Sequence, residues 1–123
     1  LHPLQQKLWF APWEPGDPLK RNCYGIPEPR RIPHKLTPAW ALDLVITPLV
    51  AFNKHGTRLG MGGGYYDRSF AYLKNRQGFS KPLLLGFGYE FQRVKKLTRN
   101  EWDIPIDIAV TDKRTWVFEQ NID

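Results

Sequence analysis

The sequence predicts an α/β fold with a mainly parallel sheet flanked by helices, and two observations carry this prediction. Short apolar runs occur at 42–50, 82–87 and 107–111, and such runs are typical of parallel strands that are covered on both faces. A segment with helical spacing of apolar residues lies between the first two runs, as in a strand–helix–strand unit. The 123 residues suffice for one compact domain, so we expect a single domain over residues 1–123.

The first third of the chain is rich in proline and gives weaker signals. Residues 7–13 have the composition of a short strand, which Pro12 would end. Residues 16–38 contain five prolines and little periodicity, which predicts an ordered but irregular loop. The run at 42–50 follows as the first strand of the main sheet, and Pro48 interrupts it near its end.

Clear turn and helix signals follow this strand. Asn53-Lys54-His55-Gly56 is a strong turn signal, so residues 51–59 predict a small hairpin that projects from the sheet. A helix is predicted over 65–75, and Gly78 would close it. Its apolar stripe consists of Tyr66, Phe70 and Leu73. Further strands are predicted at 82–87, 107–111 and 115–118.

The count of helices is low for this fold class. A parallel sheet normally has helices on both faces, but the sequence predicts only the one at 65–75. The chain also starts with Leu1, and its only methionine is Met61. We therefore expect either a processed N-terminus or a fragment that lacks the N-terminal part of a longer protein.

Composition and charge exclude several classes of protein. Lys and Arg exceed Asp and Glu by 18 to 12, a net charge of +6, which is typical of a soluble protein or of one with an anionic ligand. The basic residues are scattered, so we expect no nucleic-acid partner. A single cysteine, Cys23, excludes an internal disulfide and favours a reducing compartment. No apolar run approaches the roughly 18 residues of a membrane span, so we expect no membrane partner and a cytoplasmic location.

The glycine-rich stretch Gly60-Met61-Gly62-Gly63-Gly64 connects the predicted hairpin to the predicted helix. Glycine lets the backbone approach a ligand closely, and the unpaired N–H groups at the start of a helix favour an anion. Arg58 can donate a forked pair of hydrogen bonds to a phosphate. Asp67, in the first turn of the helix, suits a magnesium ion that also touches the phosphates.

This stretch also has a purely structural interpretation. A glycine cluster can simply let a strand pack tightly against a helix. The stretch lacks the Lys-Ser/Thr pair of a Walker A loop, and its connection to the preceding strand is too long for a Rossmann turn. The combination of arginine, glycines, paired tyrosines and aspartate after an apolar strand favours phosphate binding over packing alone.

Two longer runs give this pattern a family resemblance. Residues 43–52 (DLVITPLVAF) and residues 58–68 (RLGMGGGYYDR) closely resemble the signature of 5-formyltetrahydrofolate cyclo-ligases. Residues 25–29 (GIPEP) resemble the family's segment before the central strand, and residues 101–107 (EWDIPID) resemble its acidic loop before the last core strand. The resemblance therefore extends over nearly all of the chain, in the order expected of the family.

The resemblance implies an enzyme that uses ATP and Mg²⁺ to close 5-formyltetrahydrofolate into 5,10-methenyltetrahydrofolate, with release of ADP and phosphate. It also implies a fold like that of the NagB/RpiA/CoA-transferase proteins. The positions that match ATP-binding residues are Arg58, Leu59, Gly60, Met61, Gly62, Gly63, Gly64, Tyr65 and Tyr66. Those that match folate-binding residues are Met61, Gly62, Gly63, Gly64 and Tyr65. Asp67 and Asp107 match magnesium ligands, and Arg58 and Asp67 are the expected catalytic residues.

The implied chemistry suits these residue types. ATP would phosphorylate the formyl oxygen, the neighbouring amine of the folate would attack the activated carbon, and phosphate would depart. Both substrates bring their own nucleophiles, so the protein's task is positioning and charge neutralisation. We expect Tyr66 to point into the core as part of the helix stripe, and Tyr65 to face the pterin, where an aromatic ring can stack.

The sequence departs from the family in one respect. Family members carry an N-terminal segment that helps to hold ATP and folate, and it has no counterpart here. We therefore expect residues 1–123 to be the C-terminal portion of a cyclo-ligase that is weakly active or inactive alone and monomeric at full length, with the number of folate glutamates left open. The alternatives are a nucleotide- or polyanion-binding α/β domain without ligase activity, a sugar-phosphate isomerase, and an RNA-binding role.

Overall fold

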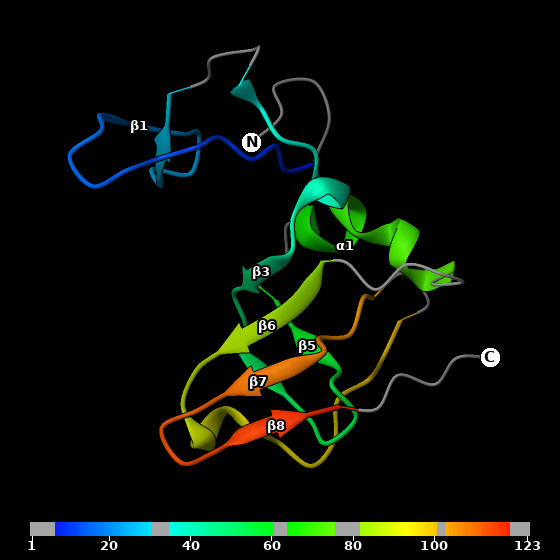
Figure 1. The fold of residues 1–123 in the computed structure, drawn as a ribbon. Coiled ribbons are helices and arrows are strands. Elements are labelled where there is room, and N and C mark those ends of the chain that lie inside the picture. Colours follow the sequence, from blue (N-terminus) through cyan, green and yellow to red (C-terminus); the bar gives the residue numbers. More distant parts are fainter. Residues whose placement is uncertain (1–6, 31–34, 61–63, 76–81, 101–102, 119–123) are drawn as a thin grey trace.

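The computed structural model describes residues 7–30, 35–60, 64–75, 82–100 and 103–118. They form a mixed α/β fold centred on a four-stranded sheet with the order β3-β6-β7-β8 (Figure 1). Two small two-stranded sheets, β1-β2 and β4-β5, accompany it. The mixed α/β class predicted from the sequence is confirmed. The described residues contain no helix with the length and hydropathy that crossing a membrane would require.

The central sheet arises from the four apolar runs that the sequence predicts as strands. The pairs β3–β6 and β6–β7 are parallel, and β7–β8 is antiparallel. Strand β3 ends directly before Pro48, which has no N–H group to continue a ladder. The strands are β3 (Leu44–Thr47), β6 (Leu83–Phe87), β7 (Ile108–Val110) and β8 (Thr115–Val117).

The predicted hairpin after β3 is confirmed as β4 (Ala51–Phe52) paired with β5 (Arg58–Leu59). Its turn is built around the buried side chain of Asn53, whose Oδ1 accepts hydrogen bonds from the backbone N–H groups of His55 and Thr57, each at 3.0 Å. Such a side-chain-to-backbone bond replaces a missing ladder bond in a tight turn. Gly56 completes the turn with a φ of +81°.

The predicted helix over 65–75 is broken into two pieces. The α-helix α1 (Tyr65–Ser69) ends at Phe70, and the 3₁₀ helix η3 (Ala71–Asn75) follows. The predicted apolar stripe is nevertheless correct, because Phe70 and Leu73 are buried and Tyr66 packs against the core. Gly78 lies outside the described residues. Two further 3₁₀ turns are η2 (Ala39–Ala41) and η4 (Glu90–Gln92).

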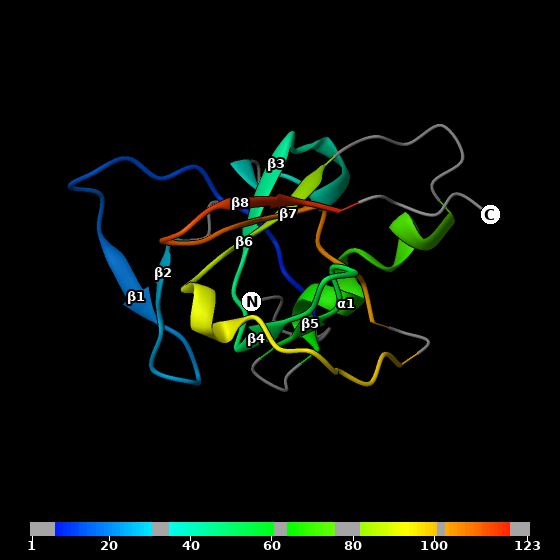
Figure 2. The ribbon, with the colours of Figure 1, turned by 90° about the horizontal axis from the view of Figure 1, so that it is seen from below.

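The covering elements of the sheet all lie on one side. Helix α1 and the β4–β5 hairpin pack against the same face (Figure 2), which we call the core face. Its strand residues include Val45, Thr47, Leu84 and Ala109, all at most 4% exposed.

The opposite side, the open face, is apolar and exposed within the described chain. The prediction that the strands are covered on both faces is therefore wrong for this chain, because no described element reaches the second face. The large exposed side chains of the open face are Leu44 (50%), Ile46 (63%), Leu83 (41%), Phe87 (67%) and Val117 (75%).

Residues 7–30 form an N-terminal arm beside this sheet (Figure 1). The predicted strand at 7–13 is wrong: only Phe10 forms a bridge, to Thr37, because the prolines that follow cannot donate ladder bonds. The predicted irregular loop contains a hairpin of β1 (Leu19–Arg21) and β2 (Pro27–Pro29). The ring of Phe10 lies 6.3 Å from that of Phe70, which ties the arm to α1.

Candidate functional site

Arg58 and Asp67, the two residues predicted to be catalytic, lie together. Arg58 comes from β5 and Asp67 from α1, on either side of the glycine-rich stretch. The Nη2 atom of Arg58 donates to Oδ1 of Asp67 at 3.3 Å, and the two side chains are 6% and 21% exposed. The Nη1 atom of Arg58 donates to the carbonyl of Pro48 at 2.9 Å. The guanidinium is therefore fixed by protein groups on two sides.

Within the described residues, the hydrogen bonds of the Asp67 carboxylate end on one of its two oxygen atoms. Its Oδ1 accepts the bond from Arg58 and a second bond from the backbone N–H of Ile104 at 3.0 Å. In the described residues, no hydrogen bond ends on Oδ2. A carboxylate that is held through one oxygen and partly exposed can offer the other to a cation.

Asp107, the second predicted magnesium ligand, occupies a different environment. It is 5% exposed and lies directly before β7. Its Oδ2 accepts a bond from the backbone N–H of Leu84 at 2.7 Å, and its own N–H donates to the carbonyl of Leu84 at 2.8 Å. These contacts close the start of the β6–β7 pair, so Asp107 has a structural role, and its metal role stays a prediction.

The donor set fits magnesium better than a metal that needs a full protein cage. In the described part of the chain, no group of three or more His, Cys, Asp or Glu side chains could hold a metal ion. Magnesium is commonly bound by one or two carboxylates together with substrate phosphates and water. The partly exposed carboxylate of Asp67 is of the type that such a site uses.

The glycine-rich stretch is described at its two ends, while Met61, Gly62 and Gly63 lie outside the described residues. A Cβ atom on Gly60 would lie 2.6 Å from Nη1 of Arg58. A Cβ atom on Gly64 would lie 2.7 Å from Nη1 of Arg68, and Gly64 has a φ of +71°. The positive φ favours glycine at position 64, and a side chain at either position would displace the end of an arginine side chain.

The helix that follows contributes less to anion binding than the sequence suggests. Helix α1 has only five residues, so few peptide dipoles are aligned behind its N-terminus. The predicted contacts of residues 59–64 with phosphates stay predictions.

Tyr65 meets an aromatic partner from the N-terminal arm. The ring of Tyr24 lies 6.1 Å from that of Tyr65 at 86°, with the two hydroxyl oxygens 3.3 Å apart. The guanidinium of Arg68 lies 5.5 Å from the centre of the Tyr65 ring. The hydrogen bond to Tyr24, with burial second, raises the pKa of Tyr65. Tyr65 and Tyr24 thus form an aromatic corner.

Tyr66 points the other way, into the core, as predicted. Its ring stacks on Phe70 at 6.4 Å and 25°, and the guanidinium of Arg58 lies 5.7 Å from its centre. Burial raises the pKa of Tyr66, and Arg58 opposes this shift. The predicted contact of Tyr66 with ATP stays a prediction.

Sequence reasoning missed two residues at this site. Tyr24 lies 41 positions before Tyr65, and no periodicity links the two. Arg68 stood within the recognised run without a role. Only its position one helical turn after Gly64 could have indicated that its side chain returns to the glycines.

A comparison with known families now decides the relationship. Residues 2–112 match the sequence model of the 5-formyltetrahydrofolate cyclo-ligase family. The chain belongs to this family. The cyclo-ligase of Escherichia coli K12 is 42% identical over 117 residues, which cover 94% of this chain and 62% of that protein. The cyclo-ligase of Haemophilus influenzae is 41% identical over 112 residues, with coverages of 89% and 58%.

Solved structures of cyclo-ligase relatives give the same result for the fold. The NMR structure of 5,10-methenyltetrahydrofolate synthetase from Aquifex aeolicus has a TM-score of 0.74 and 30% identity, and it covers 98% of this chain and 57% of that one. The synthetase of Mycoplasma pneumoniae has a TM-score of 0.55 and 28% identity, with coverages of 76% and 54%. The chain thus spans less than two thirds of the length of these relatives.

Proposed function

We propose that the protein containing this chain is a cyclo-ligase that converts 5-formyltetrahydrofolate to 5,10-methenyltetrahydrofolate and splits ATP into ADP and phosphate. The observation that carries the proposal is the Arg58–Asp67 pair beside the glycine-rich stretch, within the region that matches the family. We further propose that residues 1–123 are its C-terminal portion, with a NagB/RpiA-like fold in the complete, monomeric and cytoplasmic protein.

The proposed reaction needs orientation more than a protein nucleophile. The γ-phosphate of ATP is transferred to the formyl oxygen, the neighbouring amine of the folate attacks the formyl carbon, and the C–O bond to the phosphate breaks as the amine loses its proton. The backbone of residues 59–64 would hold the phosphates. Such preorganised donors lower the barrier because charge develops where they already point.

The aromatic corner would hold the folate. A pterin ring can stack on an aromatic face, and Tyr24 and Tyr65 present two rings at nearly a right angle. A tyrosine hydroxyl at this corner can donate a hydrogen bond to a polar ring edge. The glycine residues 62–64 would contact the same ligand, as the family resemblance implies.

Asp67 would hold the magnesium ion through Oδ2, with Asp107 as the second candidate ligand. Bound magnesium would neutralise negative charge on the phosphates. Arg58 acts here as a positioning residue, because its bond to Oδ1 of Asp67 fixes the carboxylate through that oxygen. Its direct contact with a phosphate remains part of the proposal, since a guanidinium has further N–H donors.

Formation of the methenyl product by the full-length protein, followed by absorbance, tests the proposal. Asp67→Asn should lower turnover at least about 100-fold, while Asp17→Asn, an exposed aspartate of the arm, should leave it unchanged. ATP hydrolysis that does not depend on folate would instead support the alternative, a nucleotide- or polyanion-binding domain without ligase activity, which the net charge of +6 motivates.

A further inference from the structure

Residues 48–50 connect β3 to β4. Their carbonyl groups accept hydrogen bonds from the side chains of Arg58 and Gln92. The carbonyl of Pro48 accepts from Nη1 of Arg58 at 2.9 Å. The carbonyls of Leu49 and Val50 accept from Nε2 of Gln92 at 3.4 and 3.1 Å. Three consecutive carbonyl groups are therefore fixed by two side chains that come from different elements.

Gln92 uses both ends of its amide group. While Nε2 donates to the two carbonyls, Oε1 accepts from the backbone N–H of Tyr89 at 2.7 Å. Gly88 makes room for this amide, because a Cβ atom there would lie 2.6 Å from Oε1. Leu49 packs over Gly86 in the same way, since a Cβ atom on Gly86 would lie 2.4 Å from its Cδ2. The β3–β4 connection therefore packs closely against the segment that runs from β6 to η4.

The same connection leads on to the candidate site by two routes. The backbone N–H of Val50 donates to the carbonyl of Leu59 at 2.7 Å, and Leu59 directly precedes the glycine-rich stretch. The carbonyl of Pro48 holds Arg58, which in turn holds Asp67. A shift of the connection would therefore move both the start of the stretch and the carboxylate.

Gln92 belongs to η4, which hydrogen bonds of a neighbouring residue anchor to the central sheet. The neighbouring Glu90 accepts bonds from Oγ1 of Thr111 at 2.8 Å and from Nε1 of Trp116 at 3.1 Å. These bonds tie η4 to the β7–β8 hairpin. A side chain supported in this way can transmit position to a neighbouring loop.

We infer that Gln92 is a positioning residue of the nucleotide site: it sets the position of residues 48–50, and through them that of Arg58, Asp67 and the start of the glycine-rich stretch. The identity of the ligand rests on the proposed function. Only an amide satisfies all three contacts, because a carboxylate has no N–H to donate. In Gln92→Glu, a negative charge would face the carbonyls of Leu49 and Val50. Gln92→Met retains the length of the side chain and loses all three bonds.

Steady-state kinetics of the full-length protein provide the first test. Both Gln92 variants should raise KM for ATP about 10-fold and leave KM for folate within about 2-fold, since a displacement near 1 Å can cost as much as about 100-fold. Asn100→Asp is the matched amide-to-acid control, because Asn100 is exposed and lies outside the β3–β4 connection. Equal KM values for ATP in the variants and the wild type would overturn the inference.

Amide hydrogen exchange provides a second test that does not require activity. The N–H of Val50 reports on the connection, and the N–H of Ile104 reports on Oδ1 of Asp67. Both should exchange about 10-fold faster in the Gln92 variants, whereas Ala109 in β7 should not change.

The two tests separate the inference from the proposed function. Unchanged exchange at Val50 and Ile104, or equal acceleration at all three amides, would overturn the positioning role. Absence of folate-dependent turnover in the wild type would remove the proposed reaction and leave the exchange result to decide the role of Gln92.

Discussion

The two faces of the central sheet come from the same strands, yet they differ completely in what covers them. Strand β6 illustrates this within two residues: Leu84, on the core face, is 2% exposed, and Leu83, on the open face, is 41% exposed. The register continues the division, because Ile46, Leu85, Ile108 and Val117 form one row across the open face. The apolar residues of a strand thus indicate that burial of a face would be favourable. Whether the face is buried depends on other segments that pack against it.

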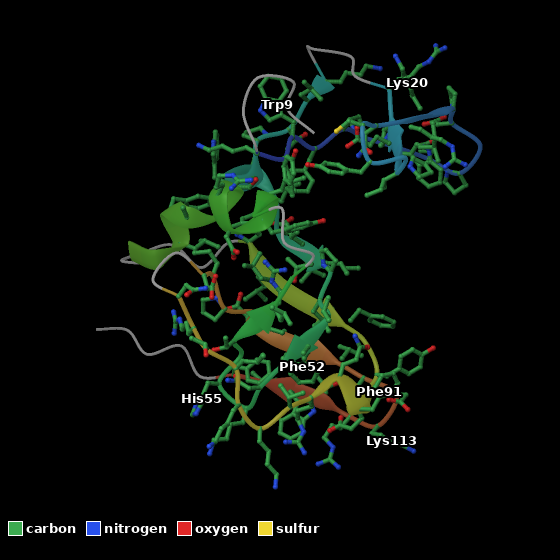
Figure 3. The ribbon with its side chains drawn as sticks, turned by 180° about the vertical axis from the view of Figure 1, so that it is seen from behind. Trp9, Lys20, Phe52, His55, Phe91 and Lys113 are labelled. Carbon is green, nitrogen blue, oxygen red and sulfur yellow. The ribbon has the colours of Figure 1, made fainter. Side chains whose placement is uncertain are left out.

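The Arg58–Asp67 pair of the candidate site belongs to the covered side. Arg58 and Asp67 come from β5 and α1, which both pack on the core face (Figure 2). The view with side chains shows Phe52 in the interior and Phe91 at the outer end (Figure 3), and their exposures are 0% and 81%. Substitutions on the core face should therefore disturb both stability and the site, whereas those on the open face should disturb neither.

The largest difference should appear between two neighbouring leucines. Leu84→Ala removes a buried side chain and leaves a cavity, so it should lower the free energy of unfolding by about 2–5 kcal/mol. Leu83→Ala, on the open face, should change it by less than about 1 kcal/mol. Urea unfolding of both variants measures the two values.

This pair also tests whether the open face is free in solution. If Leu83→Ala costs as much as Leu84→Ala, the open face is covered by another chain or by another part of the protein. A concentration dependence of the unfolding midpoint would identify another copy of the chain as the cover.

Most strands could be predicted because their signals are local. The turn at Asn53–Gly56, Pro48 and the apolar runs each mark an element boundary without reference to the rest of the fold. The bare second face could not be predicted, because an apolar pattern is the same whether or not a covering segment is present. The strand predicted at 7–13 and the loop predicted at 16–38 differ from the structure for a related reason. Prolines indicate where a ladder of hydrogen bonds is interrupted, but they do not indicate which short hairpins form between them.

Two glycines with positive φ differ in how closely other atoms approach them. Gly56, beneath the core face, has a φ of +81°, and a Cβ atom would lie 2.7 Å from the carbonyl oxygen of Ile106. Gly25, in the arm, has a φ of +76° with no atom within 4 Å of the Cβ position. Gly56→Ala should cost about 2–4 kcal/mol through strain and overpacking, and Gly25→Ala only about 1 kcal/mol through strain.

Thermal or urea unfolding of both glycine variants checks this prediction. Similar losses in the two variants would mean that backbone strain dominates and that the contact with Ile106 relaxes. A larger loss in Gly25→Ala would contradict the open space around its Cβ position.

The site could be predicted in its list of residues but not in its connections. Arg58, Asp67 and Tyr65 were recognisable because they flank a contiguous glycine-rich run. Which atoms they contact depends on residues far along the chain. Tyr24 and Ile104 reach the site only through the tertiary fold, and a single sequence contains no signal that brings them there.

The open face should also promote self-association of the chain. Phe87 is 67% exposed and Ile46 is 63% exposed, and an exposed apolar patch of this kind favours association. Phe87→Glu combined with Ile46→Lys should raise the concentration at which the 123-residue chain associates at least about 10-fold, since the charged groups resist desolvation. The free energy of unfolding of the monomer should change by no more than about 0.5 kcal/mol.

Sedimentation velocity over a range of concentrations measures the association. Glu14→Lys combined with Lys113→Glu, at two exposed residues outside the open face, likewise leaves the net charge unchanged and serves as the control; Figure 3 labels Lys113. Equal association in both double variants would show that the introduced charged groups act wherever they lie, and that the open face does not control association.

The smallest effect should come from Glu90, which belongs to neither face and ties η4 to the β7–β8 hairpin. Hydrogen bonds from Thr111 and then Trp116 lower the pKa of Glu90. Because the folded-state pKa lies below the ordinary glutamate value of about 4.3, the stabilisation is complete above that pH and is lost as the pH falls through the lowered value. Glu90→Gln should therefore unfold at a slightly lower urea concentration than the wild type at pH 7, and this difference in the unfolding midpoint should narrow as the pH falls below about 4.

Glu14→Gln in the arm serves as the control for removal of one exposed negative charge. A gap that stays constant or widens in acid would show that the geometry of the side chain at position 90, and not its charge, holds η4 in place.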